Sequence, residues 1–189
     1  DQGTLFLCKG AAFKEAYLKD AVNRGAVAYV SEKEYEAGKE IPALIVNDAR
    51  KAQFVLGEAF YDYPAKSLHV TALTGTKGKT TTTYMVRSIL ESAGIKTGLI
   101  GTIESIVGSE RIPSANTTPE SYRVQELFAK MVDAGLDAVV MEVSSQALML
   151  HRVSGFVFDI GVFTNLEPDH IGENEHKDFA DYMHCKSLL

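Results

Sequence analysis

Apolar residues follow two kinds of spacing along the chain, which predicts strands and helices in alternation. Short, nearly continuous apolar runs are typical of buried strands, and apolar residues that recur every three or four positions are typical of amphipathic helices. The predicted strands are residues 5–8, 26–30, 43–47, 68–73, 97–102, 137–143 and 158–164, and the main predicted helices are 12–24, 52–60, 83–93 and 119–134. Since such strands suit a parallel sheet covered on both faces, the pattern predicts an α/β fold with right-handed crossovers.

A domain boundary is predicted at the segment YDYPAKS, residues 61–67. Pro64 cannot continue the preceding helix, and Ala-Lys-Ser makes a short polar link. We therefore expect a small N-terminal α/β domain at residues 1–66 and a second domain, a parallel sheet with flanking helices, at 67–189. The chain does not begin with Met and its last residues follow a helical pattern. We also expect a piece of a longer protein, in which the start of the first domain is missing and the second is truncated.

Composition and charge narrow the class of protein. An apolar fraction of 46% with 23% charged residues is typical of a soluble globular protein, and a net charge of −6 argues against nucleic acid as the main partner. No apolar run approaches the ~20 residues that span a bilayer, so we expect no membrane insertion. Cys8 and Cys185 stand near opposite ends of the chain. This spacing argues against a disulfide framework and favours a reducing, cytoplasmic location.

The sequence LTGTKGKTTT (73–82) lies between a predicted strand and a predicted helix and has the chemistry of a phosphate-binding loop. Gly75 and Gly78 allow backbone angles at which main-chain N–H groups converge on an anion, and the helix adds its positive end. Lys79 can reach the β- and γ-phosphates of a nucleotide, and the Thr80 hydroxyl can bind Mg²⁺. The match to G-x-x-x-x-G-K-[ST] is partial, because Leu73 replaces its first glycine. The segment predicts a P-loop-type nucleotide site.

Further polar segments fall where predicted strands end, at the edge where open parallel sheets bind ligands. NTTPES (116–121) predicts a helix start with Thr118 as the N-cap and Pro119 at the first helical position. MEVSSQALMLHR (141–152) places the carboxylate of Glu142 at the end of an apolar strand. A carboxylate there is costly unless it is paired or bound to metal.

Two more polar segments come later in the chain. FTNLEPDHIGENEH (163–176) contains Asp169 and His170 after a predicted strand, and YMHCKSLL (182–189) predicts a helix start that carries Lys186. Taken one at a time, all of these segments also fit structural roles, as a capped helix, serine caps, or a surface histidine and lysine.

Taken together and in this order, the motifs TGTKGKTTT, NTTPES, MEVSSQAL–HR, FTNL–DH and Y–K–LL resemble the Mur ligases of peptidoglycan synthesis. The closest resemblance is to their MurE branch, the UDP-N-acetylmuramoyl-tripeptide synthetases. GTLFLCKG, RGAVAYVSE, IPALIVNDAR and FYDYPAKSLHV resemble the family's N-terminal, UDP-sugar-binding domain. The resemblance implies that residues 67–189 belong to the central P-loop ATP-binding domain and that the C-terminal ligase domain lies beyond Leu189.

The resemblance also implies the activity, that of an ATP- and Mg²⁺-dependent amide ligase. ATP phosphorylates a substrate carboxylate, and the amine of an incoming amino acid then displaces phosphate from the acyl phosphate. In MurE-like enzymes the acceptor is UDP-MurNAc-L-Ala-D-Glu, and the added residue is a diamino acid, L-lysine or meso-diaminopimelate. We expect the 189-residue chain to be a monomer that binds nucleotide weakly and does not ligate by itself.

The same resemblance implies roles by position. The ATP loop comprises Gly75, Thr76, Lys77, Gly78, Lys79, Thr80 and Thr81. The metal ligands are Thr80, Glu142, His170 and Lys186, and the catalytic residues are Lys79, Glu142, His170 and Lys186. The substrate contacts are Asn116, Thr117, Thr118, Ser144 and Arg152. Lys186 matches the family's carbamylated lysine, a modification with a physical reason. An ammonium would be repelled by Mg²⁺, whereas a carbamate is the kind of anionic oxygen ligand that Mg²⁺ prefers.

Departures from the family pattern concern substrate contacts more than the reaction class. Lys77 stands where the family usually has Asn, Gly172 where it has a second Asp, and Leu150 where some members have a substrate-contacting Gln. AAFKE (11–15) replaces the family's His-x-x-Asp-Gly segment. The additional cation at Lys77 is expected to alter nucleotide affinity.

Other interpretations stay open at this point. Within the class they are MurF, folylpolyglutamate synthase and a MurT-like amidation subunit, although NTTPES together with MEVSSQAL favours MurE. Outside the class they are a P-loop phosphotransferase or GTPase, and a nucleotide- or UDP-sugar-binding module without ligase activity. A GTPase is expected to carry a guanine-specificity motif such as N-K-x-D, to which TNLEPD is only distantly similar.

Overall fold

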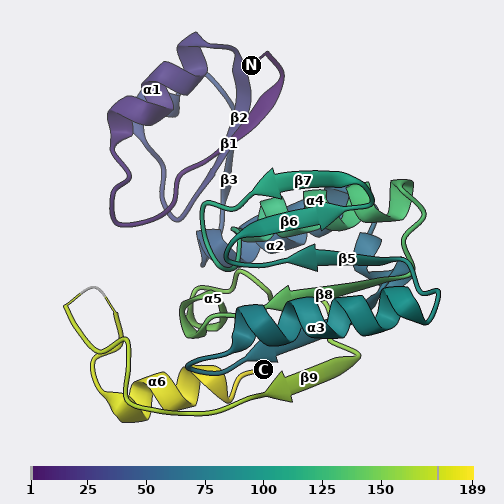
Figure 1. Cartoon of the computed structure of the whole chain (residues 1–189). Coiled ribbons are helices and arrows are strands. Elements are labelled where there is room, and N and C mark those ends of the chain that lie inside the picture. The colour runs from purple at the N-terminus through teal and green to yellow at the C-terminus, as the bar shows by residue number, and fades with distance from the viewer. Residues whose placement is uncertain (1, 174) are drawn as a thin grey trace. The chain divides into compact units, whose positions relative to one another are not determined.

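The computed structural model describes residues 2–173 and 175–189 (Figure 1). The chain divides into two compact units, Asp1–Val55 and Leu56–Leu189. Helix α2 (Ala49–Phe60) begins in the first unit and ends in the second. Both units combine helices with sheets rich in parallel strands, so the predicted α/β class is confirmed. The functional domain boundary predicted after residue 66 stays a prediction.

The first unit is built on a three-stranded parallel sheet with strand order β1-β2-β3. Its elements are β1 (Thr4–Leu7), α1 (Glu15–Asn23), β2 (Ala26–Ser31), a short 3₁₀ helix at Glu36–Gly38, and β3 (Ala43–Ile45). Its core contains Cys8, Leu18 and Tyr29. Burial raises the pKa of the Cys8 thiol to about 11, so this thiol stays protonated at neutral pH.

The second unit is built on a six-stranded sheet with the order β7-β6-β5-β8-β4-β9. Its strands are β4 (His69–Thr74), β5 (Thr97–Ile100), β6 (Glu104–Val107), β7 (Glu110–Pro113), β8 (Ala138–Glu142) and β9 (Ile160–Phe163). Neighbours among β5, β8, β4 and β9 are parallel. The carboxyl ends of these four strands therefore share one edge, which is where the polar segments follow.

The sheet is not wholly parallel, and the sequence pattern missed one hairpin. Strands β6 and β7 pair antiparallel with each other, and β6 pairs antiparallel with β5. Val107 faces Glu110 across the two-residue turn Gly108–Ser109, and Gly108 has the positive φ of 59° that such a turn requires. The hairpin extends the sheet beyond the parallel strands that carry the polar segments.

Helices cover both faces of this sheet, as Figure 1 shows for α3 and α4. The helices of the second unit are α3 (Lys79–Ser92), α4 (Ser121–Asp133), α5 (Ser145–Met149) and α6 (Phe179–Lys186), with a short 3₁₀ helix at Pro64–Ser67. In the core between α4 and the sheet, Phe128, Met131 and Met141 are fully buried. Each such side chain contributes about 1.5–3 kcal/mol by leaving water. This core fixes the sheet whose edge carries the polar loops.

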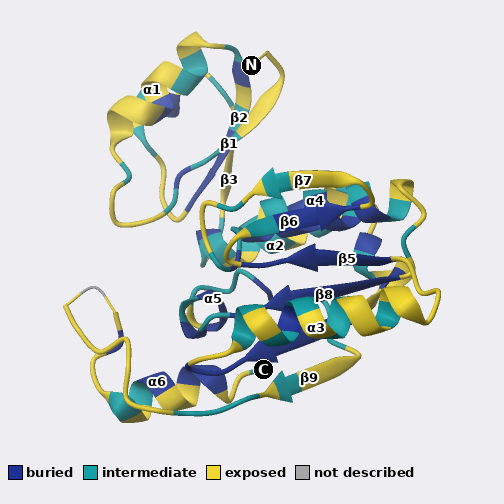
Figure 2. Ribbon diagram, in the orientation of Figure 1, coloured by how far each residue is buried: buried dark blue, intermediate teal, exposed yellow. Residues whose placement is uncertain are grey.

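Burial differs among the strands in a way that the apolar pattern did not separate (Figure 2). Every residue of β5 and β8 is buried, as expected for strands covered on both faces. Strand β9 is an edge strand in which Ile160 and Phe163 are exposed, so its prediction as a strand buried on both faces was wrong. Within the described residues, no helix has both the length and the apolar character needed to cross a membrane.

Candidate functional site

The loop between β4 and α3 has the geometry expected of an anion-binding turn. Strand β4 ends at Thr74 and α3 begins at Lys79. Gly75 has φ 150°, and Gly78, at the N-cap of α3, has φ 81°. Both angles favour glycine over residues with a Cβ. The N-terminal end of a 14-residue helix therefore faces the loop, with its free N–H groups and the positive end of its dipole.

Gly75→Ala is expected to destabilise the protein far more than Gly78→Ala. A Cβ on Gly75 would lie 2.0 Å from Thr164 Oγ1 and 3.2 Å from the Asn165 backbone, whereas a Cβ on Gly78 would meet nothing within 4 Å. Both variants carry the strain of a positive φ, about 1 kcal/mol. Only Gly75→Ala also forces the glycine-rich loop away from the segment after β9 that contains Thr164 and Asn165. We expect a loss of about 3 kcal/mol or more at Gly75. Urea unfolding followed by far-UV circular dichroism measures both, and equal midpoints would contradict the geometry.

Two lysine side chains converge on the carbonyl of Gly75. Lys79 Nζ donates to Gly75 O at 2.9 Å and to Thr76 O at 3.2 Å, and Lys186 Nζ donates to Gly75 O at 2.9 Å. Burial lowers the pKa of both amines. For Lys186 the pKa falls to about 8, where the neighbouring Lys79 lowers it further and Asp169 opposes the change. Two cations on one acceptor make a strongly electropositive loop.

Glu142 is fully buried at the end of β8 and is bound at both carboxylate oxygens. Its Oε2 accepts from Thr80 Oγ1 at 2.9 Å and from Thr102 Oγ1 at 3.0 Å, and its Oε1 accepts from Thr102 N at 2.9 Å. A Cβ on Gly101 would lie 2.5 Å from Oε1, so the absence of a side chain there leaves room for the carboxylate. The structure brings Glu142 and Thr80 together, as the resemblance to the Mur ligases implied, and adds Thr102, which the sequence motifs did not single out.

Thr102→Val is expected to lower the free energy of unfolding by about 1–2 kcal/mol, because it removes one hydroxyl donor from a buried carboxylate. Thr102→Ser keeps that hydroxyl and should recover most of the loss. Chemical unfolding of the three proteins under the same conditions measures this difference. Equal stability of the Val and Ser variants would show that the Thr102 hydroxyl does not hold Glu142.

The residues predicted to contact substrate form a connected group beside Glu142. Thr118 Oγ1 donates to Glu142 O at 2.9 Å and accepts from Ser144 N at 3.0 Å. Arg152 Nη1 donates to Thr118 O at 3.1 Å, and Thr117 Oγ1 bonds to Thr102 Oγ1 at 3.1 Å. Four of the five predicted residues are thereby joined in one network.

Asn116 and Glu120 lie at the side of this group. They line a cavity of about 240 Å³ together with Arg123. The Glu120 carboxylate lies 2.9 Å from Arg152 Nε, an ion pair whose geometry is not that of a hydrogen bond. Asn116, the fifth residue predicted to contact substrate, therefore lies beside the network, and the structure describes no hydrogen bond that joins it to the other four.

The prediction that Thr118 is a helix cap was wrong. Helix α4 begins at Ser121 and its N-cap is Glu120, so Pro119 precedes the helix. The Thr118 hydroxyl is used instead to join the ends of two loops, at the carbonyl of Glu142 and the N–H of Ser144. Ser144 is itself the N-cap of α5, because its Oγ accepts from Ala147 N at 3.1 Å.

The glycine-rich loop at residues 75–78 is held to the segment that follows β9. Thr76 N donates to Asn165 O at 3.1 Å, Lys77 N donates to Asn165 Oδ1 at 2.9 Å, and Asn165 Nδ2 donates back to Lys77 O at 2.9 Å. Lys77 Nζ pairs with Glu167 at 2.6 Å, and this hydrogen bond raises the lysine's pKa. The Lys77 ammonium thus points to Glu167, in contrast with Lys79.

Helix α6 places Lys186 beside the loop, but this helix begins earlier in the sequence than predicted. The helix begins at Phe179, with Asp178 as N-cap, and Lys186 is its last residue, so the predicted helix start at 182 was wrong. Tyr182 is fully buried and donates from its hydroxyl to Thr76 Oγ1 at 3.1 Å. The ammonium of Lys186 lies 4.6 Å from the centre of the Tyr182 ring, a cation–π contact.

His170 is exposed, and the described polar partners of its side chain are Asp169 and Glu175. Its φ is 55°, and its Nδ1 lies 3.2 Å from Glu175 Oε1. Among the described residues, no hydrogen bond or ion pair joins His170 to Glu142 or Lys186. Burial lowers the pKa of Lys79 and Lys186, and the negative charge of the neighbouring Asp169 partly opposes this change.

The donor atoms at the loop fit Mg²⁺ at two of the four predicted ligands. The hydroxyl of Thr80 and the carboxylate of Glu142 are oxygen donors that lie 2.9 Å apart, and Mg²⁺ prefers oxygen ligands. Lys186 as an ammonium cannot bind a cation, and only its carbamate would fit.

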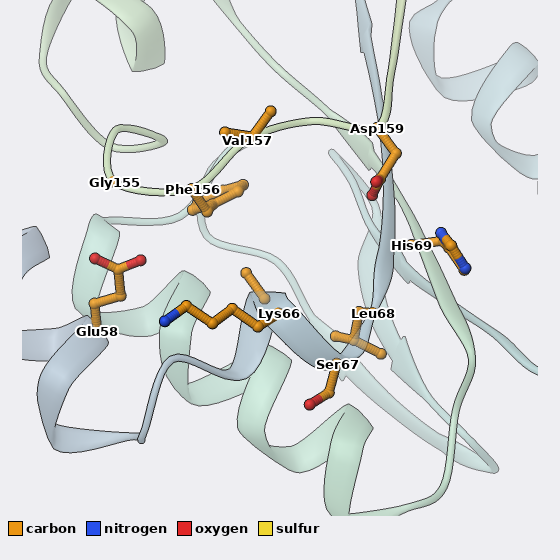
Figure 3. A pocket seen from close by; sticks show the side chains of 10 residues that line it. Glu58, Lys66, Ser67, Leu68, His69, Gly155, Phe156, Val157 and Asp159 are labelled. Atoms are coloured by element: carbon orange, nitrogen blue, oxygen red, sulfur yellow. The ribbon is translucent and has the colours of Figure 1, made fainter.

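A separate pocket of about 440 Å³ lies away from this site (Figure 3). It is bordered by the start of β4 at His69, whereas the glycine-rich loop follows the end of that strand. Glu58 and Lys66 line one side and Asp159 the other (Figure 3). The Asp159 carboxylate already accepts from Val70 N at 2.7 Å. The pocket is therefore separate from the glycine-rich loop.

A family model described as the Mur ligase middle domain matches residues 73–189. The UDP-N-acetylmuramyl-tripeptide synthetase of Limosilactobacillus reuteri is 49% identical over 191 residues, which cover 99% of this chain and 37% of that protein. The UDP-N-acetylmuramoyl-L-alanyl-D-glutamate–L-lysine ligase of Streptococcus pneumoniae is 46% identical over 189 residues, which cover 100% of this chain and 39% of that protein. The chain thus spans less than two fifths of the length of these relatives.

Solved structures show the same fold at lower identity. A UDP-N-acetylmuramoyl-L-alanyl-D-glutamate–2,6-diaminopimelate ligase matches all of this chain and 38% of its own, with a TM-score of 0.80 and 23% identity. The MurF ligase of Thermotoga maritima, solved with ADP, matches 99% of this chain and 40% of its own, with a TM-score of 0.61 and 18% identity. Because the middle-domain model matches more than half of the chain, the protein belongs to the Mur ligase family.

Proposed function

We propose that the full-length enzyme carrying this chain is an ATP-dependent amide ligase of peptidoglycan precursor synthesis. It adds a diamino acid, L-lysine or meso-diaminopimelate, to UDP-MurNAc-L-Ala-D-Glu. Relatives with 46–49% identity named as tripeptide synthetase and as L-lysine ligase support this substrate class. Residues 1–66 would form the UDP-sugar-binding domain, residues 67–189 the ATP-binding domain, and the enzyme would act as a cytoplasmic monomer.

One observation carries the proposal. A glycine-rich turn at a helix N-terminus has two lysine amines on one side, both on Gly75 O, and the paired oxygen donors of Thr80 and Glu142 close by. Cations suit the phosphates of ATP, and oxygen donors suit the Mg²⁺ that accompanies them. A chance Gly-Lys-Thr turn would not need a fully buried carboxylate beside it.

The first chemical step transfers the γ-phosphoryl group of ATP. A carboxylate oxygen of the acceptor attacks the γ-phosphorus, the bond to the β-phosphate oxygen breaks, and ADP leaves with that electron pair. The loop N–H groups from Gly75 to Thr81 would hold the phosphates. Lys79 would turn from the carbonyls of Gly75 and Thr76 to the phosphate oxygens, where it neutralises the charge that develops.

The second step forms the amide. The amine of the incoming amino acid attacks the acyl carbon, loses a proton, and displaces inorganic phosphate. Asn116, Thr117, Thr118, Ser144 and Arg152 would position the acceptor. Arg152 presents a planar set of donors that suits a carboxylate or pyrophosphate, and its link to Thr118 O holds it near Glu142. This arrangement would bring the acceptor carboxylate close to the phosphate loop.

Mg²⁺ would be held by Thr80 and Glu142, with His170 and carbamylated Lys186 as further proposed ligands. When bound, the cation would offset phosphate charge during transfer. Glu142 and Thr80 already face each other, so little reorganisation of these two side chains is needed. Carbamylation of Lys186 would replace one of two adjacent cations by an anion and end the repulsion between Lys186 and Lys79 that lowers the Lys186 pKa.

The activity of the full-length enzyme tests this function directly. We expect ADP and phosphate to form only when UDP-MurNAc-L-Ala-D-Glu and one of the two diamino acids are both present, with an equal amount of tripeptide product detected by mass spectrometry. ADP formation that ignores both additions would favour a phosphotransferase or an uncoupled nucleotide-binding module. Product formed with a tripeptide acceptor and D-alanyl-D-alanine would favour a MurF-type ligase.

A further inference from the structure

His176 is a buried titratable residue to which neither the nucleotide loop nor the predicted ligand set assigns a role. Its side chain is fully buried, and both ring nitrogens have partners. Nε2 lies 2.8 Å from Ser145 Oγ, and Nδ1 lies 3.2 Å from Asp181 Oδ2. We refer to Ser145, His176 and Asp181 as the histidine bridge.

The two ends of the histidine bridge lie on different parts of the proposed site. Ser145 is the first residue of α5 and follows Ser144, whose N–H is bound by Thr118 in the proposed substrate network. Asp181 lies on α6, the helix whose last residue is Lys186. Through its two hydrogen bonds, the bridge therefore links the turn that would hold the acceptor to α6, the helix that carries Lys186.

Helix α6 continues the connection to the phosphate loop. Tyr182, next to Asp181, packs edge-on against the His176 ring with centroids 5.2 Å apart and donates to Thr76 Oγ1. Lys186, one turn further on, donates to Gly75 O. A shift of His176 would therefore move both contacts that α6 makes with the loop.

A metal site is the other arrangement that these residues could form. His176, Asp181 and Cys185 offer a nitrogen, an oxygen and a sulfur ligand within 4.8 Å of one another. However, His176 uses both of its nitrogens in hydrogen bonds, and burial raises the pKa of the Cys185 thiol, which disfavours the thiolate that a metal requires. The geometry accordingly favours a hydrogen-bonded bridge over a metal ligand set.

We propose that His176 is a positioning residue that fixes α6, and with it Lys186 and Tyr182, relative to the turn at Ser144. The positioning role rests on the proposed ligase function, whereas the bridge itself does not. In the bridge, Nδ1–H donates to Asp181 and Nε2 accepts from the Ser145 hydroxyl. This direction agrees with the lowered pKa of Asp181, whose main cause is the hydrogen bond from His176.

The first test reads the bridge independently of activity. Long-range ¹H–¹⁵N spectra of the chain labelled with ¹⁵N-histidine should show His176 as the Nδ1–H tautomer, and Ser145→Ala should shift its Nε2 resonance. A Nε2–H tautomer, or no response to Ser145→Ala, would overturn the bridge. A new His176 signal on adding an equimolar zinc salt, lost in Cys185→Ser but kept in Cys8→Ser, would overturn it in favour of a metal site.

The second test reads the positioning role in the full-length enzyme. His176→Gln should lower kcat by about tenfold or more, because a flexible chain replaces the rigid ring, loses the ring contact with Tyr182 and weakens both bonds, and a small misplacement at an active site is costly. Adding Ser145→Ala to it should change kcat less than twofold, since both changes break one bridge. His184→Gln is the matched control, because His184 lies on the same helix and is exposed.

The outcomes of the two tests distinguish a purely structural role of His176 from a positioning role, and both from a failure of the proposed ligase function. A purely structural His176 would lower the thermal midpoint while leaving kcat per folded enzyme unchanged, which would overturn the positioning role. Losses from His176→Gln and Ser145→Ala that multiply, or a loss equal to that of His184→Gln, would overturn it as well. If the wild-type enzyme forms no amide, the proposed function fails and with it the positioning role, while the spectra still decide the bridge.

Discussion

Lys79→Ala is expected to abolish ligation by the full-length enzyme, with a fall in kcat/KM of about 10³-fold or more. Lys79 donates to the carbonyls of Gly75 and Thr76, so its amine is held at the loop where phosphate would enter. Burial lowers the pKa of this amine, and the charge of a bound phosphate would favour its protonated form. Rates of ADP and tripeptide formation at saturating and subsaturating ATP measure the effect.

Lys77→Ala is the matched control within the same loop. Lys77 is exposed and its ammonium is paired with Glu167, so its removal should change kcat/KM for ATP by less than about tenfold. Folding of both variants is checked by thermal unfolding. Near-normal ligation by Lys79→Ala, or equal losses from the two variants, would contradict the role proposed for Lys79.

Lys186→Ala is expected to lower ligation by about 10²-fold or more, and Lys186→Arg should fail to restore it. Arginine keeps the positive charge but cannot form a carbamate. Lys186→Arg would therefore restore activity if Lys186 acts only as a cation, and would not restore it if Lys186 acts as a carbamate. Steady-state kinetics in the presence of bicarbonate measure both variants. Full activity of Lys186→Arg would contradict the carbamate.

The depressed pKa of Lys186 gives the carbamate a pH dependence of definite sign. Only the neutral amine reacts with carbon dioxide, and burial, with a smaller effect from Lys79, lowers the pKa to about 8. At pH 7 about a tenth of the amine is then neutral, against about 0.03% for an ordinary lysine. Carbamate seen by ¹³C-bicarbonate NMR should therefore rise as pH increases from about 7 and level off above the pKa. No signal at any pH would contradict the modification.

The same shift affects stability in the unmodified chain. The unfolded chain binds a proton at Lys186 up to its ordinary pKa of 10.5, whereas the folded chain releases it near 8. Between these values the unfolded state holds more protons, so the contribution of Lys186 to stability rises with pH in that window. Comparison with Lys186→Met isolates this contribution.

Local patterns were enough to predict the glycine-rich turn between β4 and α3. The glycines at 75 and 78, the lysine at 79 and the change from strand to helix are all neighbours in sequence, and each expresses a local backbone or charge requirement. Glu142 could be singled out for a similar reason, since a carboxylate that ends an apolar strand needs partners. Its partner Thr80 was predicted to be near, but only through the resemblance.

Contacts between distant segments were not predictable from the pattern. Thr102 ends the strand predicted at 97–102 and belongs to none of the polar motifs, yet it makes two hydrogen bonds to Glu142. Thr118 has the sequence of a helix cap, yet tertiary contacts with Glu142 and Ser144 take its hydroxyl. His176 was visible as one polar residue in a polar segment, and only the fold places Ser145 and Asp181 on either side of it.

The hairpin β6–β7 was missed for a different reason. Its strands have four residues each, and a single Gly-Ser pair, Gly108–Ser109, is a weak turn signal between such short segments. Edge strand β9 was mistaken for a covered strand because an apolar run does not record whether both faces are covered. Neither error moved the polar segments, since these follow the carboxyl ends of the parallel strands.

A crystal structure of the full-length enzyme with Mg²⁺ and a non-hydrolysable ATP analogue tests most directly whether the Gly75–Thr81 loop binds ATP. We expect the γ-phosphate within hydrogen-bond distance of Lys79 Nζ, the loop N–H groups from Gly75 to Thr81 around the phosphates, and the cation on Thr80 and Glu142. A nucleotide bound elsewhere, with Lys79 still on the carbonyls of Gly75 and Thr76, would contradict this expectation.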